Sequence, residues 1–357
     1  MSASAVQVER RTDRTLRDLW RESTRGTAWS TLNVNRELDL IESKAVRPRI
    51  PDDHLIFRVF RAFSDPKKQI KVVLLGQDPY PEMLSIPADP DAAEAAGTEF
   101  KYPKDAVKKG EKKFVSRACG FSFSSPLGGL PFSLRIMIAE VLREYPQPAV
   151  IRTGKAPRVA VASDYSGDLA HLVGDGVFLL NTFLTLARDP NPERNSGLPK
   201  THTSWICFTT QILKFIHRTC PNAVYLALGK QAADILKASD INDAITTDHP
   251  ANARFGGRTP FAGSDIFRQC NQLLERRGVK AVEWVPMLTP IDTTYYDLQV
   301  APVENAGEID ETDQLALAES IGVGVEPSDI PLIGPADRGI DDQEDDDCED
   351  EVEDVEE

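Results

Sequence analysis

Residues 72–80 join a buried strand to a polar turn, and this stretch restricts the possible folds of the chain more than any other. Residues 72–75 are four consecutive branched apolar residues, which is typical of a short strand covered on both faces, as in a parallel sheet. Gly76 lets the backbone turn and approach its neighbours closely, and the turn then carries Asp78 and Tyr80. Because ligands bind at the carboxyl ends of strands in open α/β sheets, we expect a functional site at this turn.

Further strands and helices are predicted to alternate around this stretch. Residues 177–180 and 223–228 are predicted to form two more buried strands, and apolar residues recur at helical spacing in 53–63 and 204–217. Asn181 follows the second strand immediately. The pattern indicates an α/β fold with polar side chains at several strand ends.

Composition is typical of a soluble intracellular protein. The chain has 357 residues, of which 41% are hydrophobic, and no apolar run approaches the roughly 20 residues that cross a bilayer. No charged-then-apolar signal segment opens it. The five cysteines are scattered and include no CxxC pair, which argues against a disulfide framework, a zinc site or an iron–sulfur cluster.

The net charge of −15 is the sum of the charges of two parts of the chain, which have opposite signs. Residues 302–357 contain 22 acidic residues and one basic residue, a net charge of −21, whereas the remaining 301 residues carry a net charge of +6. A basic body suits a protein that contacts DNA phosphates, although +6 is a weak signal by itself. Like-charge repulsion and lack of apolar surface predict disorder in the acidic tail.

Five segments resemble the family 1 uracil-DNA glycosylases, in the same order along the chain. Residues 76–80 are similar to the family's active-site motif GQDPYH, although Pro81 replaces its histidine. The other segments are 120–126, 131–135, 176–185 and 246–255, which are similar to GLxFS, PPSL, GVLLLNxxLT and HPSPLS. The resemblance covers roughly residues 25–285. It implies a three-layer α/β/α sandwich around a short, mainly parallel four-stranded sheet, with residues 281–284 as a terminal strand.

The same resemblance implies hydrolysis of the N-glycosidic bond of a uracil flipped out of DNA, with no metal or organic cofactor. Asp78 would orient the attacking water and offset positive charge on the sugar. His249 would donate a hydrogen bond to uracil O2 as a neutral imidazole. Four residues would bind the base: Gln77 through its backbone, Asn181 by reading the uracil edge, Phe123 by stacking, and Tyr80 by excluding the thymine methyl group.

Contacts to DNA are expected from four residues of the resembling segments. Ser133 lies in the PPSL-like segment, and Lys230 stands where the family has a serine that grips phosphate. Ala253 occupies the place of the family's duplex-inserting leucine, so Arg254 or Phe255 is the expected substitute. These residues would add affinity for single- or double-stranded uracil-containing DNA.

Two departures from the family motif resemble its poxviral branch. Pro81 and Ala251 replace the usual histidine and serine. In that branch, the loop that corresponds to 246–255 has an arginine in place of the duplex-inserting leucine. This resemblance implies a large DNA virus as the source, with action in a nucleus or a cytoplasmic replication compartment.

Three regions are expected along the chain. Residues 1–25 form a flexible arm containing a short helix that caps the fold or binds a partner. Residues 26–290 form the catalytic domain, with an insertion at 82–119 that includes a run of lysines. Residues 291–357 form the tail. The arm or the tail is a candidate site for a replication protein partner.

Three other functions fit parts of the sequence. A catalytically weak or inactive DNA-binding protein of this fold, acting in replication or processivity, fits the insertion, the altered histidine loop and the tail. A second alternative is an interaction protein that works through its tail. A third is a glycosylase for another base. The presence of Asp78, Tyr80, Phe123, Asn181 and His249 together favours the uracil-specific enzyme.

Overall fold

The computed structural model describes residues 14–44, 49–86, 113–127, 129–146, 150–151, 158–187, 204–254, 260–286 and 288. All of these belong to the first of two compact units, residues 1–298 and 299–357. The tail expected at 291–357 and residues 87–112 of the insertion lie outside the described residues.

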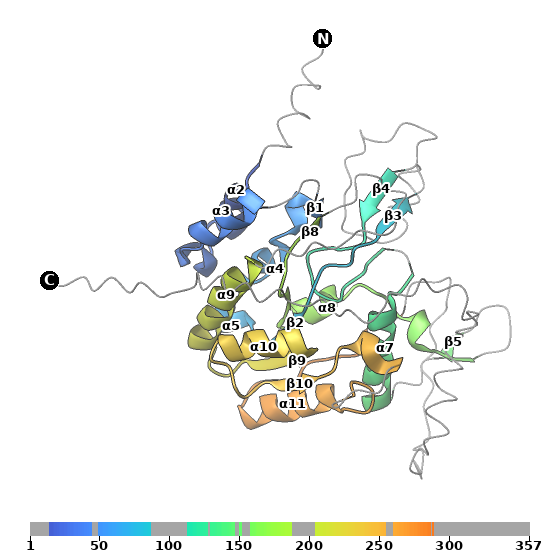
Figure 1. The fold of residues 1–357 in the computed structure, drawn as a ribbon. Coiled ribbons are helices and arrows are strands. Elements are labelled where there is room, and N and C mark those ends of the chain that lie inside the picture. The colour runs from blue at the N-terminus through green and yellow to red at the C-terminus, as the bar shows by residue number, and fades with distance from the viewer. Residues whose placement is uncertain are drawn as a thin grey trace. The chain divides into compact units, whose positions relative to one another are not determined.

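A four-stranded parallel sheet forms the centre of the first unit (Figure 1). Its strands, in spatial order, are β10 (Ile245–Thr247), β9 (Val224–Leu228), β2 (Val72–Gly76) and β7 (Val177–Asn181), and all three neighbouring pairs are parallel. Every residue of β2 and β9 is buried, as expected for strands covered on both faces. The strands end at one edge, because Gly76 pairs with Asn181 and Thr247 pairs with Leu228.

Helices flank this sheet. The helices α4 (Arg58–Ala62) and α8 (Ala170–Gly174) contact β7, whereas α10 (Lys230–Ala238) and α11 (Ile266–Arg276) contact β9. The α/β fold and the flanked parallel sheet predicted from the sequence are thereby confirmed. The part of the chain that the structure describes also contains α2 (Leu16–Thr24), α3 (Asn35–Lys44), α5 (Pro66–Gln69), α7 (Phe132–Glu144) and α9 (Trp205–Thr219).

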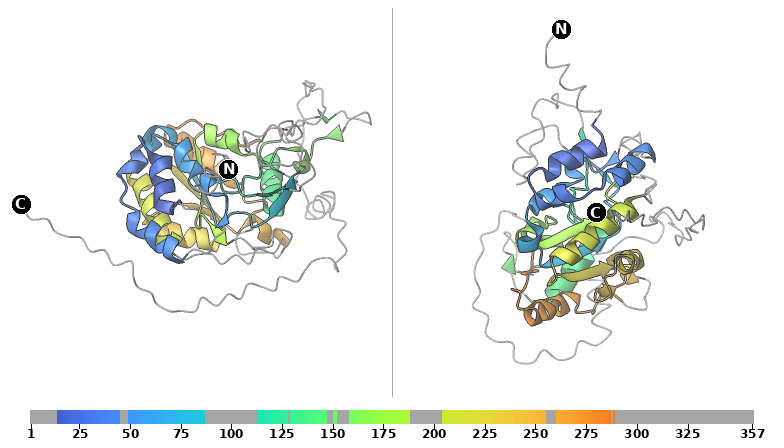
Figure 2. Two further views of the ribbon diagram at one scale, coloured as in Figure 1. Left: turned by 90° about the horizontal axis from the view of Figure 1, so that it is seen from above. Right: turned by 90° about the vertical axis from the view of Figure 1, so that its left-hand side faces the viewer.

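Aromatic side chains fill the core on the side of α2. Trp20 of α2 packs edge-to-face against Phe57, Phe60 and Phe208, with ring centroids 4.9–5.4 Å apart, an arrangement that aromatic pairs prefer. Leu16 is fully buried. Figure 2 shows α2 and α3 in blue beside the olive α9, and α3 contacts α9. The short helix of the expected arm therefore packs on the folded unit.

Two local predictions are wrong. The helix predicted at 53–63 is broken into a 3-10 turn, Asp53–Leu55, and α4, because the consecutive residues 55–57 are all buried and one helix face buries only a stripe. The segment 281–284 is not a strand. The Asn271 amide bonds both the N–H and the carbonyl of Val282, at 2.9 and 3.0 Å, in place of a strand ladder. The fourth strand is β10.

Within the described residues, three two-stranded antiparallel ribbons lie outside the central sheet. The insertion begins and ends in one of them, and the N–H of Arg117 donates to the carbonyl of Glu82 (3.0 Å) at its base. The ribbons are β1 (Arg49–Ile50) with β8 (Leu186–Ala187), β3 (Met83–Ile86) with β4 (Lys113–Ser116), and β5 (Val150–Ile151) with β6 (Arg158–Val159). The remaining short 3-10 helices are η1 (Ala28–Thr31), η4 (Ala162–Asp164) and η5 (Pro250–Arg254).

Candidate active site

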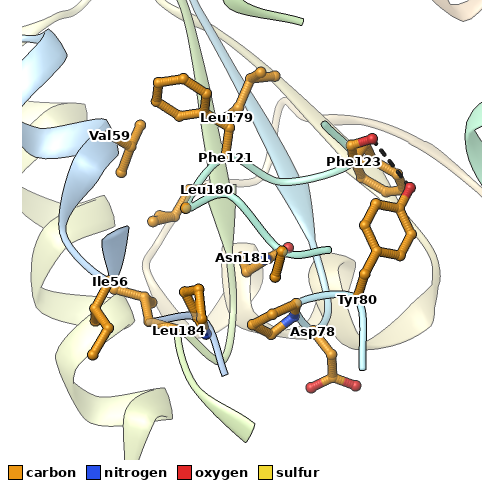
Figure 3. Close-up of a pocket in the computed structure, with 14 residues that line it drawn as sticks. Ile56, Val59, Asp78, Tyr80, Phe121, Phe123, Leu179, Leu180, Asn181 and Leu184 are labelled. Atoms are coloured by element: carbon orange, nitrogen blue, oxygen red, sulfur yellow. Dashed lines mark hydrogen bonds between the residues drawn. The ribbon is translucent and has the colours of Figure 1, made fainter. Parts of the chain in front are cut away.

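A pocket lies at the carboxyl ends of β2 and β7, where the sequence places the functional site (Figure 3). Asp78, Tyr80, Phe123 and Asn181 all line it. The cavity measures about 20 Å³, which is room for about one water molecule.

Gly76 allows two of these side chains to approach the end of β2. A Cβ atom at this position would lie 2.7 Å from Oδ1 of Asn181 and 3.0 Å from Cε2 of Phe123. Any larger residue would push the amide or the ring away from the strand end. Close packing around Gly76 thus sets the positions of Asn181 and Phe123.

Phe123 adopts an unusual backbone conformation. Its φ of 60° lies in the left-handed region, which residues with a side chain rarely occupy. Hydrogen bonds hold the chain on both sides: the N–H of Ser122 donates to the carbonyl of Leu179 (3.1 Å), and the N–H of Ser125 donates to the carbonyl of Gly167 (2.8 Å). The pocket wall is therefore a segment held against β7 and the 167–169 turn.

Tyr80 lies beside Phe123 in the pocket wall and is joined to it (Figure 3). Its hydroxyl lies 3.1 Å from the Phe123 carbonyl oxygen and 3.3 Å from Oγ of Ser133. Burial raises the pKa of Tyr80 well above its ordinary value, so the phenol stays neutral. Apolar residues pack against the ring from one side: Ile50, Met83, Ala118 and Leu186.

Asp78 and Gln77 occupy the turn after β2 in different ways. Asp78 is half-buried and lines the pocket, and its carboxylate extends away from the amide of Asn181 in Figure 3. The Gln77 side chain is exposed, and its carbonyl accepts a hydrogen bond from the N–H of Phe183 (3.0 Å). This bond ties the turn after β2 to the turn after β7.

His249 reaches the same place from the end of β10. Its imidazole stacks on Phe123, with ring centroids 5.7 Å apart. The N–H of Ala251 donates to Nδ1 (3.1 Å), so the proton of a neutral imidazole sits on Nε2. Burial lowers the pKa of His249 and favours this neutral form. Gly229, with φ of 106°, leaves room for the ring, because a Cβ there would lie 3.3 Å from the Cβ of His249.

Comparison with known proteins identifies relatives of this chain. No family profile matches the chain. Uracil-DNA glycosylase 1 of Bacteroides fragilis is 27% identical over 241 residues, which cover 66% of this chain and 83% of the relative. The uracil-DNA glycosylase of Thermobifida fusca is 28% identical over 231 residues, covering 63% of this chain and 76% of the relative. The chain is a distant homologue of the uracil-DNA glycosylases.

A solved structure of this family agrees in fold. The mimivirus uracil-DNA glycosylase superposes with a TM-score of 0.50 at 19% identity, over 78% of this chain and 92% of that one. The uracil-DNA glycosylase of human herpesvirus 7 is 25% identical over 222 residues, which cover 61% of this chain and 66% of the relative. The homologues therefore come from both bacteria and viruses.

The expected DNA-contacting residues of this glycosylase fold differ in their surroundings. Lys230 begins α10, is exposed, and places its Nζ 3.4 Å from the carboxylate of Asp234. Ser133 is only 8% exposed and faces Tyr80. Arg254 is the last residue of η5, and Phe255 lies outside the described residues.

Several apolar residues of the pocket were not predicted from the sequence. Pro51, Ile56, Phe121 and Leu184 line it beside the polar residues. Nothing in the sequence separates them from ordinary core residues, because a pocket wall and a core need the same apolar side chains. Phe121 and Leu184 lie in resembling segments, but the resemblance assigns them no role.

In the described part of the chain, no group of three or more His, Cys, Asp or Glu side chains is arranged to hold a metal ion. No helix among the same residues is long and apolar enough to cross a bilayer. Cys119, Cys220 and Cys270 are buried free thiols.

Proposed function

We propose that the protein is a uracil-DNA glycosylase, which takes uracil out of the DNA stack and hydrolyses its N-glycosidic bond to leave an abasic site. One observation carries the proposal: Asp78 and Asn181, at the ends of neighbouring strands, line one pocket with Phe123, and His249 stacks on the ring of Phe123. Distant homology to uracil-DNA glycosylases supports the same reaction.

Asp78 supplies the negative charge in this mechanism. An ionised carboxylate below the sugar orients the attacking water and offsets the positive charge that develops as the base departs. Its place in the turn directly after β2 fixes its backbone at the pocket. Water is the nucleophile, so the reaction needs no covalent intermediate on the protein.

His249 stabilises the leaving base. Because Nδ1 is occupied by the N–H of Ala251, Nε2–H is the free donor of the neutral ring. This donor bonds uracil O2, where negative charge accumulates in the transition state. A fixed dipole aimed at developing charge is an effective catalyst in a site from which water is excluded.

Three side chains select the base. The Asn181 amide offers one donor and one acceptor, which match O4 and N3–H of uracil. Phe123 stacks on the base, and Tyr80 occupies the space of the thymine methyl group. Gln77 contributes its backbone. A methyl group discriminates by only about 1–3 kcal/mol without such a steric wall.

Phosphate contacts hold the DNA in this proposal. Exposed Lys230 at the start of α10 contributes charge, and Arg254 or Phe255 fills the gap that the departing base leaves. If Arg254 is the residue that fills this gap, the protein resembles the poxviral branch in this respect as well as at Pro81 and Ala251. The substrate implies a compartment that contains DNA, and a replication protein is the proposed partner of the N-terminal residues or the tail.

The direct test uses a single-stranded oligonucleotide with one uracil. Purified protein is incubated with it, abasic sites are cleaved with alkali, and Asp78→Asn protein serves as the inactive control. Cleavage by the wild type alone supports the proposal. No cleavage by a protein that still binds the oligonucleotide contradicts it.

A second candidate is a DNA-binding protein of the same fold without activity. The insertion at 82–119, the altered histidine loop with Ala251 and the acidic tail fit it. Binding that does not distinguish uracil from cytosine in the same oligonucleotide, together with absent cleavage, is the result that this candidate predicts. Repeating both measurements without residues 302–357 shows whether the tail affects them.

A further inference from the structure

The Tyr80 hydroxyl connects the segment that carries Phe123 to α7. It lies within hydrogen-bond distance of the Phe123 carbonyl and of the Ser133 hydroxyl, and Figure 3 shows the first of these bonds as a dashed line. A phenol has one proton. When it is donated to the Phe123 carbonyl, the phenol oxygen accepts the proton of Ser133. Burial keeps this phenol protonated.

The bond reaches the one residue of the pocket whose backbone needs support. Phe123 has a φ of 60°, and a residue with a side chain keeps this conformation only where its surroundings impose it. Ser122 and Ser125 are anchored by their own N–H groups. At Phe123 itself, the carbonyl is held by Tyr80.

The orientation of this peptide determines where the Phe123 ring lies. The ring is in contact range of the end of β2 at Gly76 and stacks on His249. A turn of the backbone toward an ordinary conformation would swing the ring away from both. The Tyr80 hydroxyl therefore acts on the imidazole through Phe123.

Ser133 completes the connection from α7. It lies in the first turn of this helix and is only 8% exposed, with its hydroxyl directed at Tyr80. This placement differs from the phosphate contact that the sequence resemblance implies, because a phosphate contact requires an accessible hydroxyl.

We infer that Tyr80 and Ser133 form a hydrogen-bonded strut that holds the left-handed backbone of Phe123, and that Ser133 is a positioning residue for base stacking. The inference rests on the proposed function for its effect on activity, but its effect on the backbone is independent of any reaction. Tyr80 then has two separable roles: its ring excludes the thymine methyl group, and its hydroxyl positions Phe123.

The variant Tyr80→Phe separates the two roles, because it keeps the ring and removes the hydroxyl. We expect hydrogen exchange at the amides of Ser122 and Ser125 to become about 5- to 10-fold faster, as expected for the loss of one hydrogen bond. We expect single-turnover uracil release to slow by a similar factor, with thymine release still undetectable. Ser133→Ala changes both in the same direction but less. The double variant resembles Tyr80→Phe, because both residues act in one network.

Two substitutions serve as matched controls. Tyr145→Phe removes a hydroxyl that also lies in hydrogen-bond range of a backbone carbonyl, that of Phe267 (3.3 Å), and Ser239→Ala removes a buried serine hydroxyl bonded to the carbonyl of Ile235. Neither residue lines the pocket. Both controls should leave uracil release and exchange at residues 122–125 unchanged.

The two readouts keep this inference distinct from the proposed function. Unchanged exchange in Tyr80→Phe, with normal thermal unfolding, overturns the strut whether or not the protein is an enzyme. Thymine release by Tyr80→Phe also overturns it, since the hydroxyl would then be part of the steric wall. If the wild type releases no uracil but exchange is faster in Tyr80→Phe, the proposed function fails and the strut is supported.

Discussion

The imidazole of His249 lies against the ring of Phe123, with the two ring planes inclined by 30°. His249 follows β10, whereas Phe123 lines the pocket at the ends of β2 and β7. This contact joins the histidine loop to the pocket. A substitution in the pocket that moves Phe123 should therefore also move His249, and the reverse should hold.

Replacing Asp78 with asparagine tests the proposed charge. Asn has nearly the same shape but cannot offset a developing positive charge, so we expect uracil release to fall by about 100- to 10,000-fold. Single-turnover rates measure the effect, and thermal unfolding shows whether the fold is kept. A variant that folds normally and retains more than a tenth of the wild-type rate contradicts the assignment.

His249 is tested by two variants that differ in one acceptor. The side-chain oxygen of His249→Asn replaces Nδ1 as acceptor for the N–H of Ala251 but offers no Nε2–H, whereas His249→Leu loses both. We expect both to lose about 100-fold or more in rate, and only His249→Leu to lose stability.

The rate should also depend on pH in a defined direction. Burial places the pKa of His249 below its ordinary value, so the ring is already neutral at pH 7. The rate should not rise between pH 7 and pH 8, and a rise through that interval would show that a different protonation state is needed.

Removing the Tyr80 ring should admit thymine. In Tyr80→Ala, space for a C5 methyl group opens beside Phe123, and we expect measurable release of thymine from an oligonucleotide that the wild type does not cleave. Uracil release should decrease in the same variant, because the hydroxyl is lost as well. Comparable thymine and uracil release by the wild type is the result that rejects the steric wall.

Gly76→Ala and Gly174→Ala form a matched pair. A Cβ at 76 would meet Asn181 at 2.7 Å, whereas a Cβ at 174, in α8, meets nothing within 4 Å. We expect the first to destabilise the protein by about 1–3 kcal/mol and to impair uracil release. The second should be neutral or stabilising by up to about 1 kcal/mol. Denaturant unfolding measures both, and equal effects would contradict the close packing at β2.

The buried carboxyl group of Glu144 should make the stability of the protein depend on pH. The carboxylate accepts the N–H groups of Phe267 and Arg268 at the start of α11, and burial raises its pKa to about 7. Because the folded-state pKa exceeds the unfolded one, stability from this group is full below about pH 4.5 and is lost as pH rises through 7. Between pH 5 and pH 8, the free energy of unfolding of the wild type should fall by about 2 kcal/mol. Glu144→Gln should not show this fall.

Exposed Glu275 on α11 offers the control for this experiment. Glu275→Gln should follow the wild-type profile in denaturant unfolding at each pH. If Glu144→Gln shows the same pH slope as the wild type, the carboxyl group of Glu144 does not titrate in this range.

The central strands could be predicted from the sequence because burial on both faces requires uninterrupted apolar residues. Residues 72–75, 177–180 and 223–228 all lie in β2, β7 and β9 or within one residue of them. The fourth strand, β10, was missed, since Ile245–Thr247 is short and includes an exposed residue. The segment chosen instead, 281–284, has apolar residues but is bonded by Asn271.

The geometry of the site could be predicted only as far as its residue types. Nothing in the sequence indicates the φ of Phe123, because the left-handed conformation is imposed by neighbours such as Tyr80. The bond from Ala251 that places the proton of His249 depends on the turn after β10. Ser133 lies in a recognised segment, yet its burial against Tyr80 depends on packing of α7.

The hydrogen bond between Arg117 and Glu82 isolates the pocket from the length of the inserted sequence. Arg117 also bonds Oγ of Ser125 (3.1 Å) and the carbonyl of Gly129 (2.6 Å), so the chain is fastened just before it reaches Phe123. Changes in the residues between β3 and β4 therefore leave the distance between Tyr80 and Phe123 unchanged. A protein engineer who places a fluorescent label or a binding peptide between β3 and β4 would therefore keep the two aromatic residues at their present spacing.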